Sequence, residues 1–192
     1  MERIEKIREY LRPYIVEQTQ EKIRKAQLTE GKGLLFTVKN LLEQAWEVQK
    51  SDYGWKPAYL ALLHLKAGLL AETDEFLILL ANREFYLDES RKENYWNPDF
   101  WEKTTEEERK VRQELRKKFI QLNQYEISYA MHWVQYECRS IVGVYWKQHL
   151  QEILKLEEYR RICKEKPFVF LFGDYMGHLS ISLKSEGASC II

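Results

Sequence analysis

The stretch from Phe119 to Trp146 constrains the fold of this chain more than any other part of the sequence. It reads FIQLNQYEISYAMHWVQYECRSIVGVYW, and its only charged residues are Glu126, Glu137 and Arg139. A helix with so few charges normally packs in the interior of a protein. Its polar residues would be costly at the depth of a bilayer, so we expect a buried helix and not a membrane span.

Apolar residues at helical spacing predict a mainly α fold, a compact multi-helix bundle that forms a single domain over residues 1–192. A helix running through 104–165 would be about 90 Å long and must break, with Gly143 preferred as the break and residues 122–124 as the alternative. Two short apolar runs after Pro167 predict a small C-terminal β-hairpin at 167–184. We expect helices, including one or two long ones in the C-terminal half, at about residues 2–26, 34–50, 57–71, 73–82, 104–142 and 144–165.

Between residues 83 and 103 the helical period is lost, and acidic residues alternate with aromatic ones. The sequence predicts a long ordered loop, and such loops are often functional. Residues 72–108 hold twelve acids and four bases, a net charge of −8, which favours a basic partner. Aromatic side chains are common anchors of protein interfaces, although the same rings could instead pack back over the helices. The expected partner-binding residues are Tyr95, Trp96, Asp99, Phe100 and Trp101.

A second candidate site lies on the central helix, where four polar or aromatic side chains recur at helical spacing. These residues are Tyr125, His132, Tyr136 and Arg139. They could line a polar pocket that binds a small molecule or supports catalysis. They could equally form an ordinary amphipathic surface or the contact between two subunits of a homodimer.

A third candidate is a basic helix face formed by Arg109, Arg112 and Arg116, which could contact nucleic-acid phosphates. The competing interpretation is a solvated helix in which Glu106, Glu108 and Glu114 pair with Lys110, Arg112 and Lys118 at i to i+4 spacing. The whole chain has 30 basic and 30 acidic residues, so its formal charge gives no further support for a nucleic-acid partner.

The remaining patterns exclude several classes of protein. The chain has three isolated cysteines, which argues against a disulfide framework and favours a reducing cytoplasm. No metal-ligand, phosphate-loop or dinucleotide-binding motif occurs, so we expect no metal site, no cofactor and no catalytic residues. The sequence therefore predicts a non-catalytic cytoplasmic regulator, adaptor or inhibitor that binds another protein, with a homodimer left open.

Overall fold

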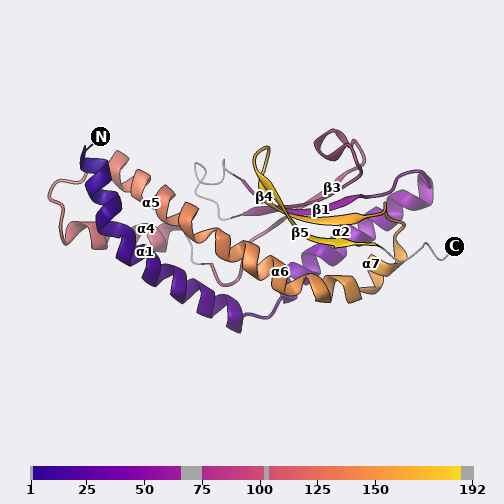
Figure 1. The fold of residues 1–192 in the computed structure, drawn as a ribbon, viewed down its shortest axis with the longest axis horizontal. Helices are drawn as coiled ribbons and strands as arrows, with labels where there is room; N and C mark the ends of the chain where they lie inside the picture. The colour runs from indigo at the N-terminus through magenta and orange to yellow at the C-terminus, as the bar shows by residue number, and fades with distance from the viewer. Residues whose placement is uncertain (1, 66–74, 102–103, 187–192) are drawn as a thin grey trace. The chain divides into compact units, whose positions relative to one another are not determined.

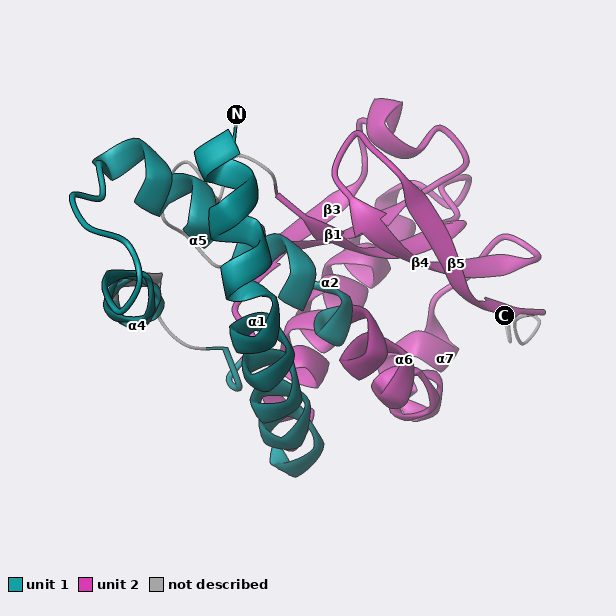
Figure 2. Cartoon of the chain, turned by 60° about the vertical axis from the view of Figure 1, so that its left-hand side comes forward, with its two compact units in different colours: residues 1–29, 67–74, 99–142 teal, residues 30–66, 75–98, 143–192 magenta. Residues whose placement is uncertain are grey.

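The computed structural model describes residues 2–65, 75–101 and 104–186, with the side chains of 104 and 105 left out (Figure 1). Two compact units make up the chain, and each is assembled from segments far apart in the sequence. Figure 2 shows unit 1, formed by residues 1–29, 67–74 and 99–142, and unit 2, formed by residues 30–66, 75–98 and 143–192.

Unit 1 is built on three helices, α1 (Glu2–Leu28), α4 (Thr104–Arg116) and α5 (Gln124–Cys138). Contacts near both ends of α1 fix the direction of its neighbours. Arg3 pairs with Glu126 near the start of α5 and Thr19 contacts Cys138 at its end, so α1 and α5 run parallel. Tyr10 bonds the end of α4 while Lys22 pairs with its beginning, so α1 and α4 run antiparallel. The core between them is apolar and includes Ile7, Leu11, Val111, Leu115, Ile127, Ala130 and Val134.

Unit 2 contains a five-stranded mixed sheet with the strand order β3-β2-β1-β4-β5. The two central strands, β1 and β4, are parallel, and every other neighbouring pair is antiparallel. Leu62 of β1 lies opposite Ile78 of β2 on one side and Phe172 of β4 on the other. The bounds are β1 (Tyr59–His64), β2 (Phe76–Ala81), β3 (Lys92–Trp96), β4 (Phe168–Asp174) and β5 (Leu179–Ser185).

Three helices cover one face of this sheet, α2 (Lys32–Ser51), α6 (Ser140–Lys155) and α7 (Glu157–Arg161), as Figure 2 shows. Trp146 of α6 packs against Phe170, with 6.3 Å between the ring centroids. On the opposite face, rings from the loop around the short 3-10 helix η1 (Phe85–Leu87) pack against a buried cluster. That cluster consists of Ala61, Leu63, Leu77, Leu79, Ala81, Val169 and Leu171.

The sheet shows that the predicted mainly α bundle with a small hairpin is wrong: the fold is mixed α and β around a central sheet. The segments YLALLH and FLILLA, expected inside helices at 57–71 and 73–82, are strands β1 and β2. Apart from His64 at the end of β1, both are apolar at every position because an interior strand is covered on both faces, and periodicity alone does not separate such a strand from a buried helix. The parts of these expectations at 66–74 lie outside the described residues.

Three further segments differ from expectation. The loop expected at 83–103 contains η1 and β3, with 102–103 outside the described residues. The helical segment 104–142 is divided into α4 and α5, and α5 starts with a capping box between Asn123 and Glu126. The helical segment therefore breaks at the alternative position, residues 122–124, and again at Arg139 between α5 and α6, four residues before the expected break at Gly143. Gly143 lies inside α6, where a Cβ atom would be 2.6 Å from the Phe172 ring, so this glycine permits close packing between helix and strand. The hairpin at 167–184 is present as β4 and β5, within the larger sheet.

Two findings bear on the environment of the protein. Cys163 is disulfide-bonded, which the isolated spacing of the cysteines did not predict, whereas Cys138 is a buried free thiol. Within 2–65, 75–101 and 104–186, no helix combines the length and the apolar character needed to cross a membrane.

Candidate functional site

The residues expected to anchor a protein partner divide into interior and surface positions. Trp96 and Phe100 are buried, at 5% and 4% exposure, and Trp96 stacks on Tyr145 with 5.8 Å between the ring centroids. Trp101 is half-buried and lies beneath the ammonium group of Lys22 at 3.9 Å. Only Tyr95, at 55% exposure, and Asp99 remain on the surface. Binding of a basic partner at this segment stays a prediction that now depends on these two side chains.

Two of the acidic side chains around this segment are engaged inside the protein. Asp88 is buried and accepts hydrogen bonds from the Trp55 indole at 3.0 Å and from the Asn82 amide at 2.7 Å. Glu107 is buried at 1% exposure and pairs with Lys22 at 2.5 Å. These internal contacts position α4 and the loop after β2, and they reduce the field available to steer a basic partner.

The three arginines expected to contact nucleic acid lie along α4. Arg109 pairs with Glu106 at 2.5 Å, and Arg112 pairs with Glu108 at 2.6 Å. Arg116 is exposed at the end of the helix. The Arg112 pair is one of those expected for a solvated helix, whereas Arg109 pairs at i to i+3 spacing, and nucleic-acid binding stays an untested prediction.

The stripe expected to line a pocket lies on the exposed face of α5. At 100° per residue, Tyr125, His132, Tyr136 and Arg139 fall within one narrow sector, and Tyr129 falls among them. The buried residues of α5, including Ile127, Ala130, Val134 and Cys138, occupy the opposite side. Tyr125 is 69% exposed and Tyr136 is 49% exposed. The stripe, with its neighbour Trp133, is therefore an outward-facing surface, which we call the α5 face.

Arginine side chains stack on the rings of the α5 face. The guanidinium carbon of Arg139 lies 3.7 Å from the Tyr136 centroid. That of Arg8, from α1, lies 5.4 Å from the Tyr129 centroid and 5.6 Å from the Trp133 ring. Arg8 forms no ion pair with any residue in the described part of the chain. A stacked guanidinium keeps its N–H edges directed outward, where they can bind a carboxylate.

The two glutamates of the central helix have different roles, which the sequence left open. Glu126 is buried at 5% exposure, pairs with Arg3 at 2.6 Å and accepts a hydrogen bond from the Asn123 amide at 3.0 Å. Glu137 is exposed and accepts a hydrogen bond from the Trp133 indole at 3.0 Å. Glu126 therefore fixes the start of α5 against α1, whereas Glu137 orients a ring of the α5 face.

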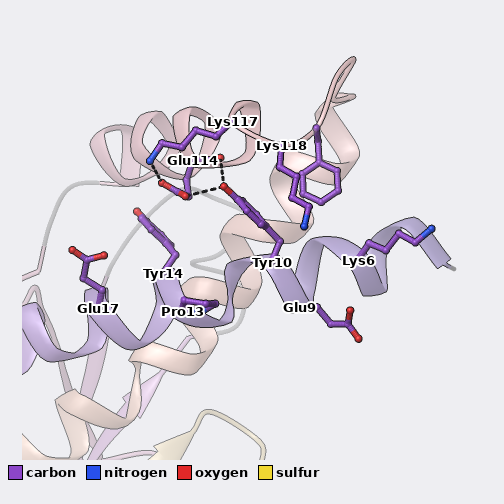
Figure 3. A pocket seen from close by; sticks show the side chains of 10 residues that line it. Lys6, Glu9, Tyr10, Pro13, Tyr14, Glu17, Glu114, Lys117 and Lys118 are labelled. Atoms are coloured by element: carbon purple, nitrogen blue, oxygen red, sulfur yellow. Dashed lines mark hydrogen bonds and ion pairs between the residues drawn. The ribbon is translucent and has the colours of Figure 1, made fainter.

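A groove of ≈ 740 Å³ lies between α1 and the end of α4, within unit 1 (Figure 3). The Tyr10 hydroxyl donates to Glu114, at 3.0 Å from Oε1 and 3.3 Å from the backbone oxygen. Lys117 binds the other carboxylate oxygen of Glu114 at 2.5 Å, and this hydrogen bond lowers the pKa of Glu114. Sequence reasoning missed this groove because its two walls are separated by about a hundred positions and carry no motif.

A histidine and an aspartate meet at the end of the central strands. His64 and Asp174 are register partners at the carboxyl ends of the parallel strands β1 and β4, with 3.8 Å between Nδ1 and Oδ1. This is the edge at which open α/β sheets commonly bind ligands. The pair was missed because the segment containing His64 was expected to be helical. A histidine and carboxylate pair alone specifies no reaction.

Comparisons with known proteins found no matching family model, no match among curated proteins and no match among solved structures. Across the described ranges, no group of three or more His, Cys, Asp or Glu side chains is arranged to hold a metal ion. The features of the molecule that bear on its function are therefore its surfaces.

Proposed function

We propose that this protein acts by binding another protein through the α5 face. The observation that carries the proposal is the exposure of Tyr125 and Tyr136, at 69% and 49%, on the side of α5 opposite its buried residues. The solvent-facing side of a surface helix normally carries charged and polar residues. The solvent-facing side of α5 carries aromatic rings instead. Exposed aromatic clusters of this kind mark interaction surfaces.

The chemistry of the α5 face indicates what kind of partner it binds. Tyrosine, tryptophan and arginine are the residues most enriched among interface positions that dominate binding energy. Arg8 and Arg139 supply two positive charges above the rings, against the one negative charge of Glu137, which accepts a hydrogen bond from the Trp133 indole. Charge complementarity therefore favours a partner surface that combines carboxylates with apolar side chains.

The test is site-specific photo-crosslinking in the cells that make the protein. A benzophenone amino acid replaces Tyr136 on the α5 face or, as a matched control, Tyr53, which is 83% exposed in unit 2. We expect an adduct at position 136 that is absent at position 53. In a second step the captured partner is purified, and its affinity should fall about tenfold or more for Tyr136→Ala, as at an interface hot spot.

Charge reversal tests the expected acidity of the partner. Arg8→Glu should abolish the adduct, whereas Arg24→Glu, at another exposed position of α1, should leave it unchanged. Circular dichroism of each variant controls for folding. The same adducts at positions 136 and 53, or an adduct insensitive to Arg8→Glu, would contradict the proposal.

A non-catalytic role as regulator, adaptor or inhibitor is the biological form that we propose for this binding activity. A cytoplasmic location also remains a proposal, supported by the composition. The disulfide at Cys163 is the observation against it, because cytosolic thiols are normally kept reduced.

A further inference from the structure

The groove between α1 and α4 continues beyond the region drawn in Figure 3. A second hollow of ≈ 570 Å³ shares Lys6, Lys118 and Phe119 with the first and reaches the start of α1 at Glu2. At the other end the first hollow is lined by Glu17. Fifteen helical residues separate these ends, so the groove follows α1 for about 22 Å at 1.5 Å per residue. That length exceeds a typical metabolite and equals six or seven residues of extended polypeptide at about 3.3 Å each.

The floor of the groove is apolar and aromatic. Tyr10 and Phe119 meet edge to face with 5.6 Å between their centroids, and Tyr14 and Pro13 continue the surface along α1. Figure 3 shows both tyrosine rings on the groove side of α1. Pro13 lacks an amide proton, so it cannot make the usual helical hydrogen bond to the carbonyl of Glu9 one turn earlier. The row of rings is suited to contact the apolar side chains of an extended peptide.

Charge is distributed unequally along the groove. Glu114 is compensated by Lys117 and Tyr10. Lys118 lies above the Tyr10 ring at 5.2 Å and forms no ion pair with another described residue. At the opposite end the carboxylate of Glu17 also lacks an ion-pair partner among the described residues. Glu9 also lies along this part of α1, but Figure 3 shows its side chain directed away from α4, so the groove presents the Lys118 ammonium group towards one end and the Glu17 carboxylate at the other.

We propose that this groove binds an extended peptide segment of another protein, six or seven residues long. The segment carries an acidic side chain at the Lys118 end, a basic side chain at the Glu17 end and apolar residues between them. The middle residues pack on Tyr10, Tyr14 and Phe119. This proposal is independent of the α5 face, because the two surfaces share no residue.

The test is selection of a displayed library of random heptapeptides on the full chain. Selected peptides should be apolar in the middle with opposite charges at their two ends. Synthetic versions should bind Lys118→Glu and Glu17→Lys at least tenfold more weakly than the unmodified protein. The matched controls are Lys147→Glu and Glu5→Lys, exposed charges outside the groove that should leave affinity unchanged.

Two further measurements make the outcome decisive. Circular dichroism shows whether each variant is folded, and the double variant Lys118→Glu with Glu17→Lys should recover affinity for a peptide whose end charges are exchanged. Selection that yields no peptide above background overturns the proposal. Peptides that bind the two groove variants as well as they bind the controls also overturn it, because they then bind elsewhere.

Discussion

A buried lysine in unit 2 makes the stability of this protein depend on pH in an unusual direction. Lys164 is 7% exposed, and its ammonium group donates hydrogen bonds to the carbonyls of Tyr159 and Ile162, the latter at 2.8 Å. Burial lowers the pKa of Lys164 from the ordinary value of 10.5 to about 8. The folded protein therefore releases this proton more readily than the unfolded chain does.

The sign of the effect follows from proton linkage. Between pH 8 and 10.5 the unfolded state holds more of this proton than the folded state, so the free energy of unfolding rises with pH. Below pH 8 the full penalty for burying the charge is present, about 3 kcal/mol for a pKa difference of this size. Raising the pH from 7 to 9.5 should remove about 2 kcal/mol of that penalty.

The assay is urea unfolding of the wild-type protein and of Lys164→Met at several pH values from 7 to 9.5. Methionine does not titrate, so the variant should lack the contribution of Lys164 to the pH slope, and the two slopes should differ by about 2 kcal/mol over this range. Other groups affect both proteins alike, including Cys138, whose pKa burial raises. The substitution should also lower the free energy of unfolding by an amount that does not depend on pH, because two buried carbonyls lose their hydrogen-bond donor. Equal pH slopes for the two proteins would refute the reasoning.

Three further predictions concern stability and are measured by urea unfolding at pH 7. Asp88→Ala should destabilise the protein by about 2–4 kcal/mol, because the Trp55 indole and nearby backbone amides lose a buried acceptor; Asp88→Asn should recover part of this. Gly143→Ala should cost about 1–3 kcal/mol, since the added methyl group would lie 2.6 Å from the Phe172 ring, and no loss would show that the ring moves freely. Lys22→Met should cost about 3–5 kcal/mol by leaving a buried carboxylate uncompensated, whereas removing both partners of the pair should cost less.

The sequence predicted the two N-terminal helices closely because their apolar positions recur at a clear helical period. It failed for β1 and β2, which have six residues each, are apolar apart from His64 and carry no periodic signal. The run YLALLH follows Pro57, which was interpreted as the first residue of a helix, and its length is typical of a strand. Without those strands the C-terminal hairpin appeared to be isolated, and the sheet that it completes was missed.

The candidate sites were predictable only to the extent that they depend on a single element. The stripe of Tyr125, His132, Tyr136 and Arg139 could be found by placing one helix on a wheel, and its outward orientation follows from the structure. Trp96 could not be assigned to the interior, because its stacking partner Tyr145 is far away in the sequence. The groove was beyond prediction for the same reason, since Tyr10 and Glu114 meet only once α1 and α4 are packed.

The pairing of β1 with β4 also has a consequence for how the chain acquires its structure. Leu60 lies opposite Phe170, so the central pair of the sheet joins segments separated by more than half of the chain. Contacts of such sequence separation slow folding, because a long loop must close before they form. During synthesis β1, β2 and β3 leave the ribosome well before β4. Until β4 emerges, the backbone groups along one edge of β1 have no strand to pair with. The nascent sheet is then open to pairing with other chains, and conditions that slow translation should extend that interval.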